Sequence, residues 1–217
     1  MRITWSSSIL AISGVAAVAL AWWLSGTSFS RKDVLLGLLT SYAVTVVFYF
    51  LVVWFPEQRK RRRIKSGIIS HYIQFKKEVL GLVLHAAKKG WSQDDLDRLI
   101  IPKEFSEYFS EDETGSGMRW YEVLNGLDDY YVAEIANRLE LLRSEVQFVL
   151  SSIDIQDQEV FEFMKRLSEI SFKMSKMRSD YDGQKSWGHF LWALYSDFDP
   201  SVGDVPFDRN LKLLERL

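Results

Sequence analysis

The chain has 217 residues, of which 47% are hydrophobic and 14% aromatic, and its formal net charge at pH 7 is -2. It contains no cysteine, which excludes disulfides, zinc thiolate sites and cysteine nucleophiles and suits a reducing cytoplasm.

Two hydrophobic runs open the chain. Ile3–Leu24 and Val34–Phe55 each have 22 residues and contain no Asp, Glu, Lys, Arg or His. At about 1.5 Å of rise per residue, each run as a helix spans a hydrocarbon core of roughly 30 Å. Only Ser25–Asp33 lies between them. The sequence therefore predicts transmembrane helices at residues 3–24 and 34–55, which form a tight hairpin.

A signal peptide is the alternative interpretation of the first run, because Arg2 precedes it and Ala19 and Ala21 resemble a cleavage site. However, the run is longer than a typical signal core, Trp22 and Trp23 follow the small residues, and a second apolar run comes next. We therefore favour a membrane span.

Small side chains recur at four-residue spacing in both runs: Ser13, Ala17 and Ala21, then Gly37, Ser41 and Thr45. Such stripes let membrane helices approach closely. They predict packing within the hairpin, with Ala21 near Gly37 and Ser13 near Thr45. Alternatively, with several chains together, one stripe faces neighbouring subunits or a water-filled centre. Neither run carries the ionisable residues that proton relays and carriers need.

A basic collar at residues 56–67 follows the second run, and its cations are Arg59, Lys60, Arg61, Arg62, Arg63 and Lys65. The loop between the runs has only Arg31 and Lys32. Because basic clusters stay on the cytoplasmic side, both termini are expected there, in a multi-pass protein of a bacterial inner membrane. Anionic lipids attract such a collar by about 1 kcal/mol per cation, so no extended nucleic-acid surface is needed to explain it.

The remaining residues, 68–217, are expected to form one cytosolic all-helical domain. From Ile64 onward the chain has 19 basic and 27 acidic residues, so this part is acidic. Two series of apolar residues at steps of three and four predict an antiparallel helical hairpin, in which Asp154 is expected to be the N-cap of the second helix. The first series is Val132, Ile135, Leu139, Leu142, Val146 and Val149; the second is Val160, Phe163, Leu167, Ile170, Met174, Met177 and Tyr181.

The other segments also carry helix signals, so the fold class is all-α. A helix is expected from Phe55 through the collar to Lys89, interrupted at Pro56 and ended by Gly90. Ser92 and Asp95 resemble a capping box, and Pro102 suits a first helical turn. Short helices are expected at 186–196 and 207–217, and loops at 111–117 and 199–208.

No catalytic motif is present, so we expect no enzyme activity, no metal and no cofactor. His71, His85 and His189 lack partners at metal spacing and are interpreted as ordinary polar residues. One segment resembles a calcium loop in its carboxylate spacing, but Val202 stands where the sharp turn needs Gly. The residues concerned are Asp197, Asp199, Ser201, Gly203 and Asp208.

Local basic groups in this acidic domain are candidates for binding an anionic ligand: Lys76, Lys77, Lys88, Lys89, Lys173, Lys176 and Arg178. Together with abundant aromatic residues, among them Trp91, they suit a small anionic nucleotide, which needs cations for phosphates and flat rings for bases. The alternative is a solvated helix face and an aromatic core.

The overall plan of membrane hairpin, basic collar and small helical domain resembles small bacterial antiviral membrane effectors linked to type III CRISPR systems or retrons. The resemblance covers the whole chain but rests on architecture, so it assigns no site residues. Effectors linked to type III systems are gated by cyclic oligoadenylate, and those linked to retrons act with a reverse transcriptase. The expected function is a homo-oligomeric membrane-permeabilising effector that senses a ligand or partner. The alternative is a membrane-anchored adaptor that recruits a cytosolic protein.

Overall fold

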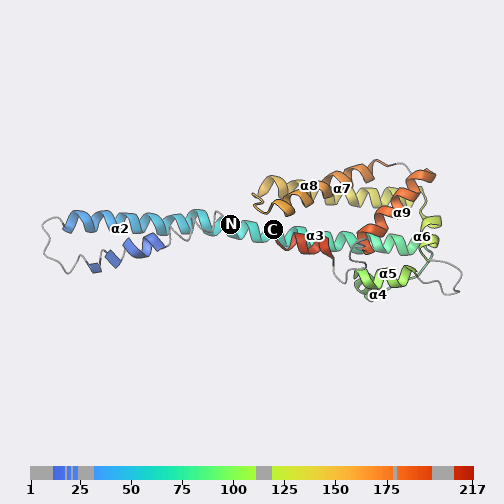
Figure 1. The fold of residues 1–217 in the computed structure, drawn as a ribbon, viewed down its shortest axis with the longest axis horizontal. Coiled ribbons are helices and arrows are strands. Elements are labelled where there is room, and N and C mark those ends of the chain that lie inside the picture. Colours follow the sequence, from blue (N-terminus) through green and yellow to red (C-terminus); the bar gives the residue numbers. More distant parts are fainter. Residues whose placement is uncertain are drawn as a thin grey trace. The chain divides into compact units, whose positions relative to one another are not determined.

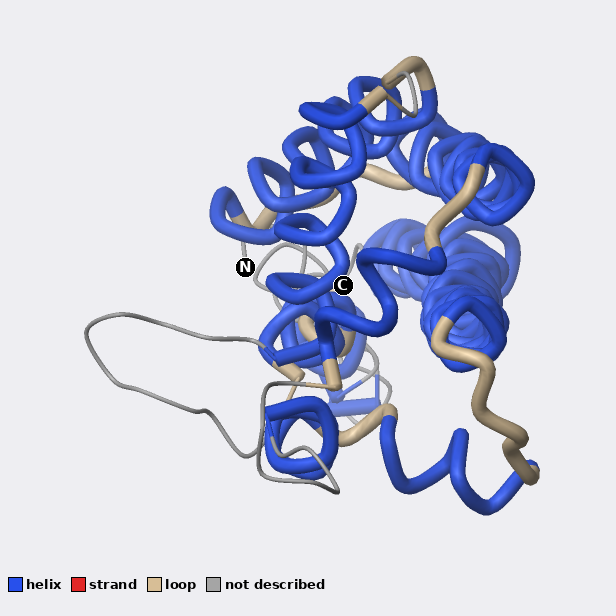
Figure 2. Tube along the Cα trace, turned by 90° about the vertical axis from the view of Figure 1, so that its right-hand side faces the viewer, coloured by secondary structure: helices blue, strands red, loops and turns tan. Residues whose placement is uncertain are grey.

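The computed structural model describes residues 12–17, 19–20, 22–23, 32–110, 119–177, 180–196 and 208–217. Every regular element within these ranges is helical, and none is a strand (Figures 1 and 2). The expected all-α fold class is therefore confirmed. The chain divides into two compact units, Met1–Arg63 and Ile64–Leu217, which are described in turn.

The N-terminal unit is built on a helical run that starts with α2 (Lys32–Tyr49), passes through the π-helical segment η1 (Phe50–Trp54) and enters α3 (Phe55–Ala86) (Figure 1). The second hydrophobic run of the sequence is thus helical from end to end. From Leu36 to Ala86 it contains the one helix, among the described residues, that is long and apolar enough to cross a membrane. The described residues of the first hydrophobic run are also helical.

Pro56 does not interrupt the helix, contrary to the sequence prediction. A proline has no N–H and its ring clashes with the carbonyl four residues earlier, so it strains an ordinary α-helix. Here the turn before it is widened into η1, where the Phe55 N–H donates to the carbonyl of Phe50, five residues back. Such π-helical turns accommodate misfits in a helix without ending it. The chain consequently continues as α3 through the basic collar.

In the C-terminal unit, the described residues after α3 form seven further helices: α4 (Gln93–Leu99), α5 (Pro102–Ser110), α6 (Trp120–Gly126), α7 (Asp129–Ser152), α8 (Gln158–Ser175), α9 (Tyr181–Ser196) and α10 (Arg209–Leu214). Helix α3 supplies the centre of the core, where Tyr72, Val79 and Leu80 have no exposed surface. Helices α7 and α8 lie side by side (Figure 1). An aromatic cluster of Phe105, Phe109, Trp120, Trp192 and Tyr195 joins α5, α6 and α9.

Two helix starts predicted from the sequence, those of α4 and α5, are present in the structure. Ser92 Oγ accepts from the Asp95 N–H at 3.2 Å while Asp95 accepts from the Ser92 N–H at 2.9 Å, so the predicted capping box is confirmed. The Ser92 N–H and the Ser92 hydroxyl both donate to the Asp95 carboxylate, and these two hydrogen bonds lower the pKa of Asp95. Pro102 is the first residue of α5, also as predicted.

Two predicted helix boundaries are wrong. Helix α8 is capped by Asp157 and not by Asp154, because the Asp157 carboxylate accepts the N–H groups of Glu159 and Val160. Helix α3 ends at Ala86, before Gly90. Lys88 adopts φ 55°, its N–H donates to His85 and the Lys89 N–H to Leu84. This is a Schellman end, in which Lys88 takes the left-handed position that usually belongs to Gly.

The paired helices α7 and α8 test the two apolar seams. All six residues predicted on α7 are buried. On α8 the buried residues are Val160, Met164, Leu167, Ser171 and Met174, so Ile170, which remains 45% exposed, was wrongly placed in the seam. Both faces of α8 carry apolar residues at helical spacing. The small side chain of Ser171 allows its own face, rather than that of Ile170, to pack closely.

Two other helices differ in length from the sequence prediction. Helix α9 starts at Tyr181 rather than at 186, and α10 covers Arg209–Leu214 rather than 207–217. The predicted loop at 111–117 and most of that at 199–208 lie outside the described residues.

The α7–α8 seam gives a stability prediction. Leu142 has no exposed surface, so Leu142→Ala should lower the free energy of unfolding by about 2 to 5 kcal/mol through lost burial and a cavity. Ile170→Ala and Lys165→Ala on the exposed side of α8 should each cost less than about 1 kcal/mol. Denaturation followed by circular dichroism measures these costs in the full chain. Equal losses for Leu142→Ala and Ile170→Ala would show that the seam is wrongly assigned.

Candidate functional site

A polar groove of about 460 Å³ lies between α3, α4 and α7 in the C-terminal unit. We call it the α3–α4–α7 groove. Because its α3 residues recur at steps of three and four, they share one face of that helix. The lining residues are Gln74, Lys77, Glu78, Gly81, Leu82 and His85 of α3, Trp91 before α4, Gln93 and Leu96 of α4, and Arg138 of α7.

The indole of Trp91 is held in place as one wall of the groove. Its Nε1–H donates to His85 Nδ1 at 3.2 Å, and the two rings meet edge to face with centroids 5.6 Å apart. His85 Nδ1 also lies 3.1 Å from the Gly81 carbonyl oxygen, so this ring nitrogen stands between the indole and the α3 backbone. A Cβ at Gly81 would stand 3.2 Å from Trp91 Cζ2. The Schellman end at Lys88 thus turns the chain so that Trp91 lies on α3.

The charges in the groove are balanced. Arg138 donates to Glu134 Oε2 at 2.6 Å, while its Nε lies 3.2 Å from Glu78 Oε2 without hydrogen-bond geometry. Lys77 forms an ion pair with Asp97 of α4. An anion that enters must compete with these carboxylates. The groove is suited to a ligand with one flat ring for Trp91 and several polar groups.

A second site is a buried ion pair between α3 and the start of α10. Lys76 is 1% exposed, and its Nζ lies 2.8 Å from Asp208 Oδ2. The hydroxyl of Tyr72 donates to the same carboxylate at 3.2 Å, and the Leu211 N–H donates to its other oxygen at 3.0 Å. Every charge buried here therefore has partners, as a low-dielectric interior requires.

Tyr195 completes this cluster. Its hydroxyl donates to the backbone carbonyl of Lys76 at 2.5 Å, and the Lys76 ammonium lies 5.0 Å from the centre of its ring. Burial raises the pKa of Tyr195 well above its ordinary value, and the negative charge of Asp208 acts in the same direction. A small cavity of about 220 Å³ adjoins Lys76, Tyr72 and Asp208.

The predicted basic ligand-binding residues are not gathered in one place. Lys76 is engaged by Asp208 and Lys77 by Asp97, while Lys89 Nζ is 3.8 Å from Glu122. Lys88, Lys173 and Lys176 are exposed. Arg178 lies outside the described residues. Of the members of this set that the structure describes, Lys77 alone lines the groove, beside Trp91.

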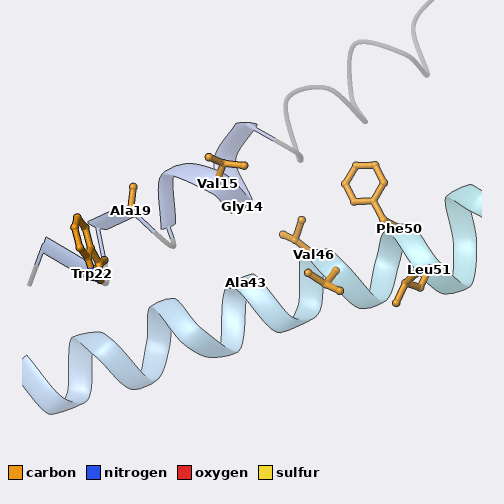
Figure 3. Close-up of a pocket in the computed structure, with 9 residues that line it drawn as sticks. Gly14, Val15, Ala19, Trp22, Ala43, Val46, Phe50 and Leu51 are labelled. Atoms are coloured by element: carbon orange, nitrogen blue, oxygen red, sulfur yellow. The ribbon is translucent and has the colours of Figure 1, made fainter. Parts of the chain in front are cut away.

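Within the N-terminal unit, the first helical segment packs against α2 through residues that differ partly from those predicted. Ser13 Oγ lies 2.7 Å from the hydroxyl of Tyr42, and Ala17 is buried. A Cβ at Gly14 would lie 2.9 Å from Val46 Cγ1. Gly14 and Val46 also border an apolar groove of about 610 Å³ (Figure 3).

The predicted stripe on α2 is exposed at Gly37, Ser41 and Thr45. No described atom lies within 4 Å of a Cβ added at Gly37, and the Thr45 hydroxyl donates to the Ser41 carbonyl at 2.8 Å. Ala21, the predicted partner of Gly37, lies outside the described residues. Packing within the hairpin and contact with another chain through this stripe therefore both stay predictions.

The basic collar is helical. All six cations are on α3; Arg59, Lys60, Arg62 and Arg63 are exposed, and Arg61 and Lys65 are half-buried. The Arg59 guanidinium lies 4.1 Å from the Phe55 ring centre, and Lys65 donates to the backbone carbonyl of Glu215.

Sequence reasoning missed the pairing of His85 with Trp91 and that of Lys76 with Asp208. The sequence did contain an indication of the His85–Trp91 pairing. A helix that ends soon after His85 reverses the chain, and a residue six positions later can then lie against the helix. Asp208 carried only an N-cap signal for α10. Among the described residues, no group of three or more His, Asp or Glu side chains could hold a metal ion.

The buried pair gives a prediction about stability. Asp208→Asn leaves the Lys76 charge buried without a counter-ion and should lower the free energy of unfolding by about 3 to 5 kcal/mol. Adding Lys76→Met should recover most of this loss. The matched control is Asp97→Asn, whose partner Lys77 is 31% exposed, and it should cost less than about 1 kcal/mol. Chemical denaturation measures the free energy of unfolding of each variant. Equal losses for the two Asp variants would contradict the assignment of Lys76 and Asp208 as a buried ion pair.

Comparison of the chain with known protein families, with curated proteins and with solved structures gives no match. Function is therefore argued from the residues and their geometry.

Proposed function

We propose that this chain is a membrane effector whose cytosolic helical unit senses a ligand or partner and whose membrane helices, in an oligomer, make the bilayer permeable. The observation that carries the membrane assignment is the exposure of α2. Leu38 and Phe48 of α2 and Leu51 of the adjoining η1 are each 64% exposed, and a long helix with such side chains outward is suited to lipid and not to water. Its backbone bonds are satisfied internally, as lipid demands.

The proposed topology is a two-helix hairpin with both termini in the cytoplasm of a bacterial cell. Its support is the collar on α3, which directly follows the apolar segment and has four exposed cations. Positive clusters beside a span remain on the cytoplasmic side. The first apolar run, whose described residues are helical and contact α2, supplies the other arm.

This topology predicts the effect of removing the collar. Replacing Arg59 to Arg63 by Gln should give mixed orientations, because the charge bias that fixes insertion is lost. A reporter fused at Thr27 should be active only outside the cytoplasm in the unaltered chain. Replacing Lys173 and Lys176 by Gln is the control, with no effect on orientation. Cytoplasmic activity of the Thr27 reporter in the unaltered chain would contradict the topology.

The permeability proposal rests on the exposed stripe of α2. One hairpin encloses no pore, so several chains are needed. Gly37 and Ser41 offer small, exposed surfaces that no described residue of the first helical segment covers, and small residues are where membrane helices approach closely. The α3–α4–α7 groove is the proposed sensor site, where Trp91 would stack on a planar ring, a nucleotide base included, and Lys77 and Arg138 would meet its anionic groups.

Membrane potential provides the test. Expression of the chain should depolarise cells in a dye assay, and Gly37→Leu should abolish depolarisation while the protein remains in the membrane. Ala16→Leu adds bulk at an exposed position outside the stripe and should remain active. Full activity of Gly37→Leu, or a strictly monomeric protein in membranes, would reject the pore.

The second candidate is a membrane-anchored adaptor. It is favoured by the large apolar side chains exposed on α8, where Phe161, Ile170 and Phe172 are 37%, 45% and 47% exposed. In this case the spans serve only as an anchor, and a soluble chain of residues 64–217 would keep full activity without depolarising cells.

A further inference from the structure

One face of α7 is exposed along the whole helix and carries no charge. We call it the uncharged α7 face. Its residues are Tyr130, Ala133, Asn137, Leu141, Ser144, Phe148 and Ser151, and all seven are exposed. At 100° per residue they fall within an arc of about 80°, away from the buried seam of the same helix. The large side chains Tyr130, Leu141 and Phe148 are 63%, 59% and 54% exposed.

Single exposed apolar residues are ordinary on a protein surface. Here, however, they alternate with small uncharged residues at steps of three and four over six turns, and Glu134, Arg138 and Glu145 flank them on one side. An uncharged seam with charged flanks is the pattern with which helices pair. The face is therefore organised as a contact surface.

We propose that the uncharged α7 face binds the same face of a second copy of this chain, with the two α7 helices antiparallel. In a twofold contact, if residue i meets residue j, then j meets i. The face has this symmetry about a point between Glu140 and Leu141. Position 130 then meets 151, 133 meets 148 and 137 meets 144, and all six belong to the face.

The residues that meet are complementary in size. Tyr130 faces Ser151 of the second copy and Phe148 faces Ala133, so each large side chain finds a small one. Asn137 faces Ser144, and these two side chains can form a hydrogen bond. The two Leu141 side chains lie next to each other at the axis, where exclusion of water is most complete.

Size complementarity sets the direction of the pair. In this register Glu145 of the second copy faces position 136, about 3 Å along the axis from both Glu134 and Arg138, so charge does not choose between the two directions. In a parallel pair each position would instead meet its own copy. Phe148 would then face Phe148 and Ala133 would face Ala133, and the large side chains would not find small ones.

The contact is independent of the membrane proposal, because it lies wholly within the unit from Ile64 to Leu217. Loss of the α7 contact with retained depolarisation would reject the contact and leave the proposed function intact. Failure of depolarisation with an intact α7 contact would reject the proposed function and leave the contact intact.

Cysteine cross-linking tests the register, because the chain has no cysteine of its own. The full chain in detergent is treated with a short bifunctional maleimide. Leu141→Cys should give covalent dimers. A mixture of Phe148→Cys and Ala133→Cys chains should also cross-link, whereas each alone should not, since identical positions are then about 22 Å apart along the axis. Dimers of Phe148→Cys alone would overturn the antiparallel pair.

Affinity gives the companion measurement. Leu141→Lys should weaken dimerisation, measured by sedimentation, roughly tenfold or more, since a charge enters the dry centre of the contact. Ile170→Lys is the matched control on α8 and should dimerise as the unaltered chain does. Circular dichroism confirms that both variants remain folded. A monomeric unaltered chain at all concentrations, or equal losses for both variants, would reject the proposal.

Discussion

Backbone hydrogen bonding along the helical run from Leu36 to Ala86 is the constraint on which both units depend. The run carries an apolar segment, a basic collar and the central core helix, and a break in it would leave polar backbone groups without partners in an apolar surrounding. Pro56 falls where such a break is expected. The wide turn of η1 absorbs it, with Phe55 bonded to Phe50. Helical continuity is thus preserved by a local change of helix type.

Helix α3 also organises the C-terminal unit, because one of its faces packs in the core and another lines the α3–α4–α7 groove. Tyr72, Lys76 and Val79 point into the core, whereas Gln74, Lys77 and Glu78 line the groove. The adjacent residues Lys76 and Lys77 therefore differ in their exposure to solvent. The first is buried and needs Asp208, while the second is at the surface and pairs with Asp97 in water. The same chemical group is a structural element in one position and a candidate ligand contact in the next.

What the sequence predicted well follows from local rules. The α7 seam, the Ser92–Asp95 capping box and Pro102 at the first turn depend only on nearby spacing, and all three are present. The α8 seam was wrong at Ile170, because Ile170 and Ser171 offer two adjacent faces and only packing against α7 selects between them.

The candidate site was less predictable, because its contacts join distant residues. Trp91 meets Gly81 only because Lys88, not Gly90, takes the left-handed turn. Lys76 pairs with Asp208, a residue far along the chain, and the spacing of neither residue indicates the other. In each case helical periodicity predicts the helix face on which a residue lies, whereas tertiary packing decides which residues contact that face.

The separation of 132 residues between Lys76 and Asp208 has a consequence for biosynthesis. During translation Lys76 leaves the ribosome soon after the apolar segment, whereas its counter-ion follows 132 residues later. The core around Lys76 cannot close with both charges paired until α10 emerges, so the final packing of this unit is expected only after Asp208 has left the ribosome. Until then the apolar face of α3 is open to chaperones.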